Sequence, residues 1–276
     1  MGIFLATLAS VFTGTGDFLG GLASRGGSVW GVGTWNHLAG AVVVPALALA
    51  LGGEITVDLV VWGSAAGIAG AVGVVALYAG FTQSSMSVVS PIAAVGSATW
   101  PVVWSVARGD IPGGLVLIGI VVGIVAIWVV SGGSRTALVG DPVGLRYGVI
   151  SGLGFGSMLI LLSFTADGSN IWALFPARIS GAVFLIILAS RLGHRIRLPR
   201  RSLLLAILAG TATVVGNGLF IISAGIELLA VATVLAAMFP ATTVLLAWLV
   251  LHERLTPRRM SGLALALVAV GLVAAG

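Results

Sequence analysis

Ten runs of about twenty mainly apolar residues follow one another along the chain, with short polar connections between them. A helix needs about 20 such residues to cross the hydrocarbon core of a bilayer. Apolar residues make up 59% of the 276 positions and charged residues only 8%, against about 25% charged in a soluble domain. The sequence therefore predicts an all-α integral membrane protein with ten transmembrane helices, at residues 3–23, 31–51, 60–81, 86–107, 113–131, 144–165, 170–190, 202–224, 229–251 and 257–275.

Several classes of function are excluded by what the sequence lacks. It contains no Cys, so disulfides, thiol chemistry and Cys-ligated metals are ruled out. No zinc-protease motif, Walker motif or Ser-His-Asp order is present, so we predict no catalytic residues, no metal site and no cofactor. Residues 14–17 (Gly-Thr-Gly-Asp) lack the preceding strand and the spacing of a dinucleotide-binding loop. The protein is not expected to be an enzyme.

The basic residues, all 13 of which are Arg, lie mostly in the connections between spans. With the loops numbered one to nine, the odd loops hold eleven Arg, the even loops hold only Arg108, and Arg178 lies inside a span. Because cytoplasmic loops carry the excess of basic residues, we expect the odd loops in the cytoplasm and both termini outside, in the cell membrane. We interpret the basic loop 191–201 as an orientation signal facing anionic lipid, and we expect no nucleic-acid binding.

Fragments of the first half recur in the second half at a nearly constant offset. Shifts of 140, 141 and 143 residues align 14–16 with 154–156, 37–42 with 178–183, and 92–94 with 235–237. An odd number of spans in each half inverts the second half, and inverted repeats are typical of transporters with a substrate site near the midplane. We predict two inverted five-helix repeats in one membrane domain, residues 1–133 and 134–276, an arrangement that favours a monomer.

Motifs at the ends of both halves carry a family resemblance. In the second half, Thr233 and the segment 240–243 (Pro-Ala-Thr-Thr) lead into 251–256 (Leu-His-Glu-Arg-Leu-Thr), followed by Gly262 and Gly271. In the first half, 90–91 (Ser-Pro), 108–112 (Arg-Gly-Asp-Ile-Pro) and 14–18 (Gly-Thr-Gly-Asp-Phe) are the counterparts. Together they resemble EamA-type transporters of the drug/metabolite transporter superfamily, with His252 replacing the usual Gly of a Gly-Glu-Arg-Leu-Thr turn. The resemblance implies a secondary transporter, often an exporter of amino acids, metabolites or drugs.

Asp17 is an ionisable residue inside the first span. A charged side chain within a bilayer is costly and marks an ion or substrate pathway by default. We interpret Asp17 as a carboxylate that couples protons or cations, or as a substrate ligand; small multidrug transporters, distant relatives, use an acidic residue of the first helix in a similar way. The alternative is a structural acid that pairs with a neighbouring helix end or with Arg25.

His37 and Arg178 occupy matching positions in the two halves, each about seven residues, or roughly 10 Å, into its helix. They would flank a central cavity from two sides. The planar guanidinium of Arg178 suits a carboxylate or phosphate, and His37 is a group that titrates in the physiological range. The alternatives are an Arg178 side chain that extends to the interface and a His37 ring that is hydrogen-bonded for packing.

The remaining candidates are uncharged. Asn36 and Asn217 are amides within spans that either contact substrate or bridge helices. Tyr78, Trp100 and Trp104 could line an aromatic site, and the two Trp share a helix face; packing and interface anchoring are the alternatives.

The sequence thus predicts a secondary transporter, most simply an exporter working by alternating access with proton coupling. A channel or facilitator, a membrane scaffold and an intramembrane enzyme remain as alternatives. The expected partners are a small-molecule substrate, protons and the bilayer.

Overall fold

The computed structural model describes residues 1–109, 113–131, 141–165, 171–224, 226, 235–236 and 238–275. Within these residues all regular secondary structure is helical. The elements are α1 (Gly2–Arg25), α2 (Val29–Leu51), α3 (Val57–Gln83), α4 (Met86–Ala107), α5 (Gly114–Ser131), α6 (Pro142–Leu162), the 3-10 turn η1 (Ile171–Ala173), α7 (Leu174–Arg191), α8 (Arg200–Ala224), α10 (Phe239–Leu251) and α11 (Pro257–Ala275). Eight of these ten α-helices are long and apolar enough to cross a membrane. The predicted all-α membrane fold is confirmed.

Most helix boundaries lie within about three residues of the predicted ones. The ninth predicted span, 229–251, differs, because α10 begins only at Phe239. Pro240 lies in the first turn of α10, where its missing N–H breaks no intrahelical hydrogen bond. Some predicted features lie outside the described residues: the repeat boundary at 133/134, Arg135 and Thr233. The same holds for residues 110–112 of the segment 108–112 and for residue 237 of the aligned segment 235–237.

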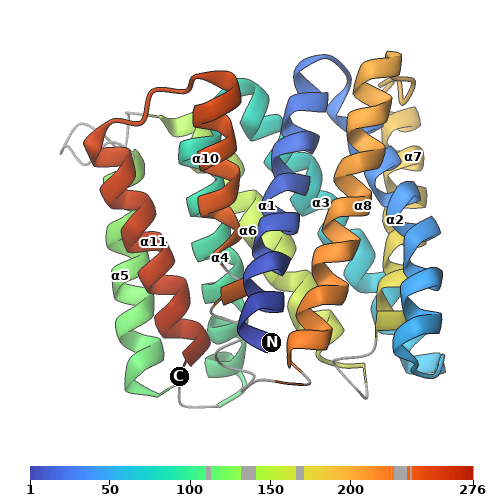
Figure 1. Cartoon of the computed structure of the whole chain (residues 1–276), viewed down its shortest axis with the longest axis horizontal. Coiled ribbons are helices and arrows are strands. Elements are labelled where there is room, and N and C mark those ends of the chain that lie inside the picture. The colour runs from blue at the N-terminus through green and yellow to red at the C-terminus, as the bar shows by residue number, and fades with distance from the viewer. Residues whose placement is uncertain are drawn as a thin grey trace.

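The helices run in alternating directions, so that both termini lie at one end of the bundle (Figure 1). The described odd-numbered connections lie at the opposite end, together with Arg25, Arg191, Arg195 and Arg254; we call this the arginine-rich end. Arg108 follows α4 at the end that carries the termini, here called the terminal end. The described chain therefore separates most of its arginines from its termini, as the sequence predicts.

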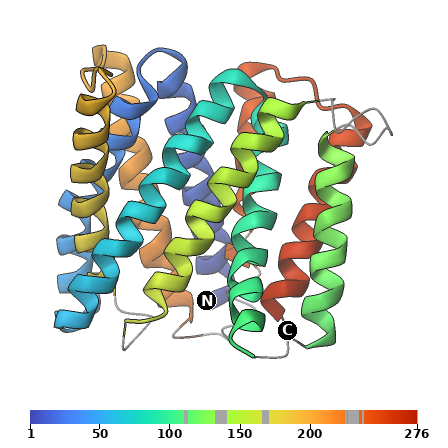
Figure 2. The same ribbon diagram turned by 180° about the vertical axis from the view of Figure 1, so that it is seen from behind.

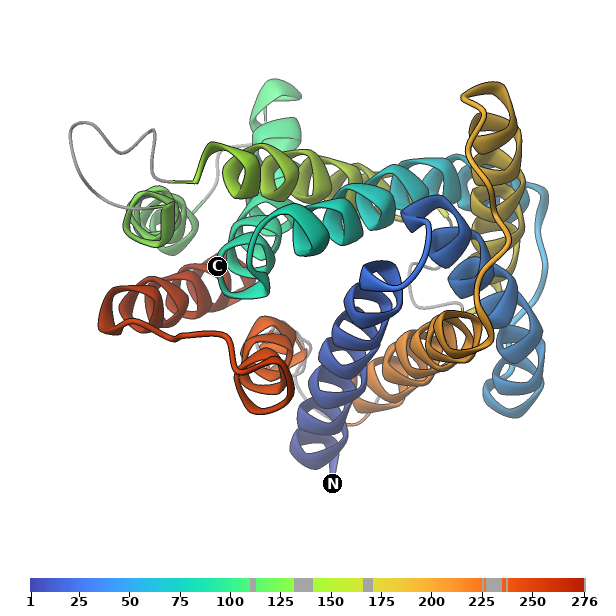
Figure 3. The ribbon, with the colours of Figure 1, turned by 90° about the horizontal axis from the view of Figure 1, so that it is seen from above.

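Two sets of helices face each other across the molecule (Figure 3). On one side α1 packs against α8 and α10, and on the other α6 packs against α3 and α4. The pair α5 and α11 closes one edge, while α2 and α7 contact each other at the other edge (Figures 1 and 2).

Glycine allows two of these contacts to be unusually close. A Cβ on Gly210 of α8 would collide with the backbone carbonyl of Asn36 on α2. A Cβ on Gly67 of α3 would collide in the same way with the carbonyl of Ala177 on α7. Small residues at helix interfaces permit such approach in membrane proteins. These contacts fix the backbone at Asn36 and beside Arg178.

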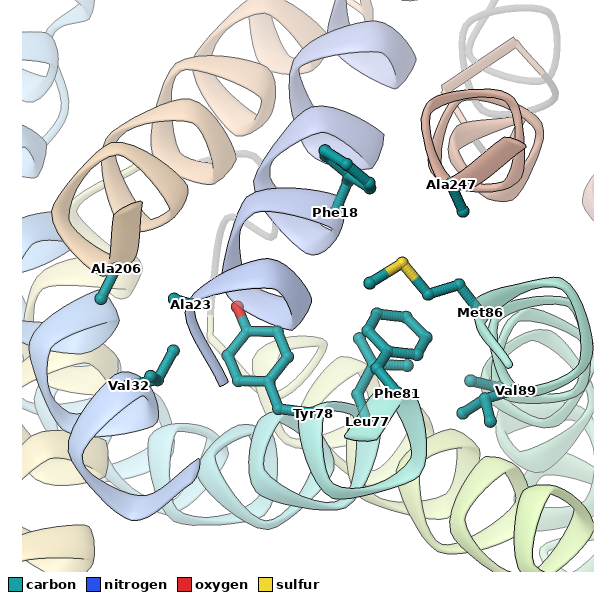
Figure 4. Packing of buried hydrophobic residues seen from close by; sticks show 11 residues of the cluster. Phe18, Ala23, Val32, Leu77, Tyr78, Phe81, Met86, Val89, Ala206 and Ala247 are labelled. Atoms are coloured by element: carbon teal, nitrogen blue, oxygen red, sulfur yellow. The ribbon is translucent and has the colours of Figure 1, made fainter. Parts of the chain in front are cut away.

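Buried apolar side chains fill the bundle near the arginine-rich end. Figure 4 shows Phe18, Leu77, Phe81, Met86 and Val89 converging from α1, α3 and α4. All five lie close in sequence to helix ends at the arginine-rich end. We call this group the apolar seal, because it fills the interior between that end and the middle of the bundle.

Candidate functional site

A cavity of about 220 Å³ lies in the middle of the bundle between the two sets of helices. Its wall reaches the first residues of α7 and α10, which begin at the terminal end, so the cavity extends from the apolar seal toward that end. It is lined by Thr13, Asp17, Asn36, His37, Gly67, Gly70, Val74, Tyr78, Ser97, Phe155, Met158, Leu159, Leu174, Ala177, Arg178, Thr213, Asn217 and Phe239. Six of the eight residues singled out from the sequence are among them.

A chain of hydrogen bonds joins three helices along one wall. Arg178 of α7 donates from Nη1 to Oδ1 of Asn36 on α2, at 3.1 Å. Asn36 in turn donates from Nδ2 to the Tyr78 hydroxyl on α3, also at 3.1 Å. All three side chains are buried. The amide of Asn36 thereby orients both the guanidinium and the phenol, a role that the sequence left open between bridging and substrate contact.

The Arg178 guanidinium forms no ion pair within the described residues, although the side chain is only 9% exposed. A buried charge without a counter-charge is costly in a membrane protein. The guanidinium of Arg178 has five N–H donors, and the neutral amide of Asn36 accepts from only one of its nitrogens. The remaining donors can bind an anionic group that enters the cavity.

Asp17 lies on the opposite set of helices, in α1, and its side chain is half-buried at the cavity wall. No hydrogen bond or ion pair to its carboxylate is formed in the described part of the chain, but it interacts electrostatically with Tyr78. Arg25 is not its partner, because Arg25 pairs with Glu253 at 3.0 Å. Of the two structural pairings considered for Asp17, the one with Arg25 is therefore excluded.

His37 is buried beside Arg178, with which it interacts electrostatically. Its Nδ1 lies 2.9 Å from the Gly33 carbonyl oxygen. A carbonyl oxygen only accepts, so Nδ1 carries the hydrogen and a neutral ring leaves Nε2 as an acceptor. His37 and Arg178, aligned through the offset of 141 residues, thus meet at one cavity.

Comparison with known proteins agrees with this architecture. Residues 142–275, which cover the second half of the chain, match the EamA-like transporter family. The second half of the chain therefore belongs to the EamA-like transporter family. Together with the long apolar helices, this match supports a multi-pass membrane transporter of the drug/metabolite type.

One solved structure, described only as "Crystal structure of protein", resembles this EamA-like chain with a TM-score of 0.60 at 16% identity. The match covers 96% of this chain and 95% of the other. At that identity the likeness shows the fold alone. No curated protein matches the chain.

The other residues singled out from the sequence divide between this transporter's cavity and its periphery. Asn217 of α8 lines the cavity. Trp100 does not; its Nε1 donates to the Ser157 hydroxyl at 3.0 Å. Trp104 is 42% exposed and lies with Arg108 at a separate depression of about 390 Å³ between α4 and α6. The two Trp residues therefore do not line this cavity, and their positions fit the packing and anchoring alternatives.

Several lining residues of the EamA-like cavity were not predicted. Thr13 and Thr213 lie one helical turn before Asp17 and Asn217, respectively, and face the same cavity. Because residues four apart share a helix face, this spacing could have predicted both threonines from Asp17 and Asn217. Phe155, Met158 and Phe239 gave no such signal, because apolar residues in a membrane helix face lipid and interior alike.

Proposed function

We propose that this transporter moves small zwitterionic metabolites that carry an apolar side chain, such as amino acids. The observation that carries the proposal is a pair of opposite charges, Asp17 and Arg178, which line one cavity and have no ion-pair partner among the described residues. An ammonium group would bind near Asp17 and a carboxylate near Arg178. The apolar part of the substrate would contact Phe155 and Met158.

The size of the cavity favours small metabolites over drugs. Sites for drug-sized ligands measure roughly 300–1,000 Å³. The cavity here measures about 220 Å³. A substrate of amino-acid size is the better fit.

We also propose that the chain works by alternating access between two inverted five-helix repeats. The support is that equivalent positions of the two halves pack against each other in both directions. Gly210 contacts Asn36, and Gly67 contacts Ala177. Gly67 lies 143 positions before Gly210, and Ala177 lies 141 positions after Asn36. Gly40 contacts Arg178, and Gly181 contacts His37, in the same exchanged manner. The apolar seal speaks against a continuously open channel, so a change between two states would be needed for passage.

Asp17 is the proposed proton site. Its carboxylate faces the cavity without a hydrogen-bond donor in the described chain, so it can exchange a proton and can meet a cationic substrate group. An inward proton gradient would then drive the substrate outward by antiport. We place the arginine-rich end in the cytoplasm and both termini outside the cell membrane, on the distribution of arginines.

Proteoliposomes with an imposed pH gradient test the coupling. We expect radiolabelled amino acids to move against their gradient with wild-type protein, and Asp17→Asn to lose gradient-driven accumulation by at least tenfold. Ser97→Ala, at a neutral lining residue, is the control and should retain it. Equal transport by Asp17→Asn and wild type at every pH would refute the coupling role.

Substrate chemistry is tested separately by competition. A zwitterion should compete about tenfold better than the matching amine or carboxylate alone, because only the zwitterion engages both charges. In Arg178→Lys the preference for the carboxylate should fall, since an ammonium lacks the planar fork of Arg. Flux that follows only the substrate gradient, with all three compounds equal, would instead favour an uncoupled facilitator.

A further inference from the structure

A second recess lies on the outside of the bundle, away from the transport cavity. This groove of about 480 Å³ has α3 as its floor, α6 and α7 as its walls and the start of α2 at its upper end. It is lined by Val29, Trp30, Val72, Val75, Ala76, Ala79, Gln83, Tyr147, Ile150, Phe184, Leu185, Leu188 and His194. In Figure 2, α3 leans away from α7 toward the arginine-rich end. The groove opens toward that end, where Trp30, Gln83 and His194 line it. We call it the α6–α7 groove.

The α6–α7 groove has the length of one acyl chain. Its floor runs along α3 from Val72 to Gln83, which is about 16 Å at the helical rise of 1.5 Å per residue. Half of a hydrocarbon core about 30 Å thick is about 15 Å. The small side chains of Ala76 and Ala79 deepen the floor. The groove therefore extends through one leaflet, on a surface that faces the bilayer.

The polar side chains of the groove lie at its upper end. The Trp30 ring stacks on His194 with centroids 5.3 Å apart. Gln83 donates from Nε2 to the Tyr147 hydroxyl at 2.8 Å. Aromatic rings of this kind belong at the level of lipid headgroups. The lower part of the groove is apolar. The change from apolar to polar along the groove matches that along a phospholipid.

Three arginines adjoin the polar end. Arg146 precedes Tyr147 and lies 5.9 Å from its ring centroid, Arg191 lies one helical turn beyond Leu188, and Arg195 follows His194. All three are exposed, and none forms an ion pair within the described residues.

Acidic groups at the same end are already engaged. Asp141 accepts from the Gly144 N–H and from the Ser84 hydroxyl, and Glu253 pairs with Arg25. The positive charge beside the groove is thus not neutralised by acidic residues of the described chain.

We propose that the α6–α7 groove binds one anionic phospholipid, with an acyl chain along α3 and the phosphate beside Arg146, Arg191 and Arg195. Basic pockets between transmembrane helices bind anionic headgroups in this way. A groove of apolar residues alone would accept any lipid, so the three arginines provide the selectivity. This site is independent of the transport cavity and of its substrate.

Purified protein in nanodiscs with trace fluorescent phosphatidylglycerol in a phosphatidylcholine background gives the affinity directly, and native mass spectrometry gives the number bound. We expect one retained phosphatidylglycerol. The triple variant Arg146→Gln/Arg191→Gln/Arg195→Gln should bind at least tenfold more weakly, since each basic residue contributes about fivefold. The control Arg201→Gln/Arg254→Gln/Arg258→Gln removes the same charge at the same end, from other exposed positions, and should retain binding.

The acyl-chain half of the proposal has its own test. Val72 is 39% exposed on the floor, and Val72→Trp should fill the groove and displace the lipid, while Val121→Trp, at an exposed valine of α5, should not. Equal losses in both arginine triples, or an unchanged affinity in Val72→Trp, would overturn the proposal. So would equal competition by inorganic phosphate, which would indicate an anion site without lipid. Cross-linking of Val72→Cys between two copies would overturn it as well, because a second chain would then occupy the groove.

Discussion

At the residue scale, Asn36 connects the cationic wall of the cavity to α3. Asn36→Leu keeps the size of the side chain but removes the partner of Arg178 and of Tyr78. Interhelical hydrogen bonds in membrane proteins contribute about 0.6 kcal/mol each on average, and unpaired buried groups cost more. We therefore expect a loss of stability of about 1 kcal/mol or more, measured by denaturant unfolding in detergent. Asn217→Leu is the control, since Asn217 lines the same cavity but donates no hydrogen bond within the described chain; equal losses in both would contradict the bridging role.

Single residues also show what the sequence could reveal. Asp17, His37 and Arg178 were predictable because a charged or titratable side chain in a span must face the interior or a partner. The offset of 141 residues further paired His37 with Arg178. The orientations of Trp100 and Trp104 were not predictable, since an aromatic ring is equally stable against lipid, a neighbouring helix or a cavity.

At the element scale, hydropathy predicts where the transmembrane helices lie in the sequence. It does not predict which face of each helix points toward the interior of the bundle. Lipid is as apolar as the bundle interior, so the helices lack the amphipathic period that orients a soluble helix. The aligned offset of the first helix illustrates the difficulty. Gly16 contacts Thr213, and Gly70 contacts Met158. The two contacts are equivalent in the two halves if Gly16 corresponds to Met158. That correspondence is an offset of 142 residues, whereas the sequence alignment of 14–16 with 154–156 has an offset of 140. Glycines two positions apart in both helices make the two offsets hard to distinguish from the sequence.

The glycine contacts give a prediction for helix packing. Gly210→Ala would place a methyl group against the Asn36 carbonyl and separate α8 from α2. Overpacking costs about 1–3 kcal/mol, so we expect a lower unfolding temperature and less folded protein in fluorescence-detected size exclusion. Gly114→Ala in α5 is the matched control: nothing lies within 4 Å of its added Cβ. Helix propensity predicts that Gly114→Ala is neutral or stabilising. A stable Gly210→Ala variant would show that α2 and α8 approach less closely.

At the scale of the whole molecule, Glu253 links the two halves of the chain at the closed end. Its carboxylate pairs with Arg25 at the end of α1 and accepts from the backbone N–H groups of Met86 and Ser87, which begin α4, at 3.3 and 3.4 Å. An anion at a helix N-terminus is stabilised by the helix dipole. These contacts lie at the outer edge of the apolar seal, so opening the arginine-rich end would break them. We expect Glu253 to stabilise the state in which that end is closed.

The absence of Cys makes this prediction directly measurable. Val89→Cys places a single thiol in the apolar seal, where Val89 is fully buried. Because a partly exposed ion pair contributes at most about 1 kcal/mol, adding Glu253→Gln should raise labelling of that thiol by a membrane-impermeant maleimide about fivefold. The increase should occur only when the reagent is applied at the arginine-rich end. Arg254→Gln, at the neighbouring exposed residue of the same turn, should leave labelling unchanged. Increased labelling from both ends would indicate general loosening of the bundle, and unchanged labelling would show that the seal alone keeps this end closed.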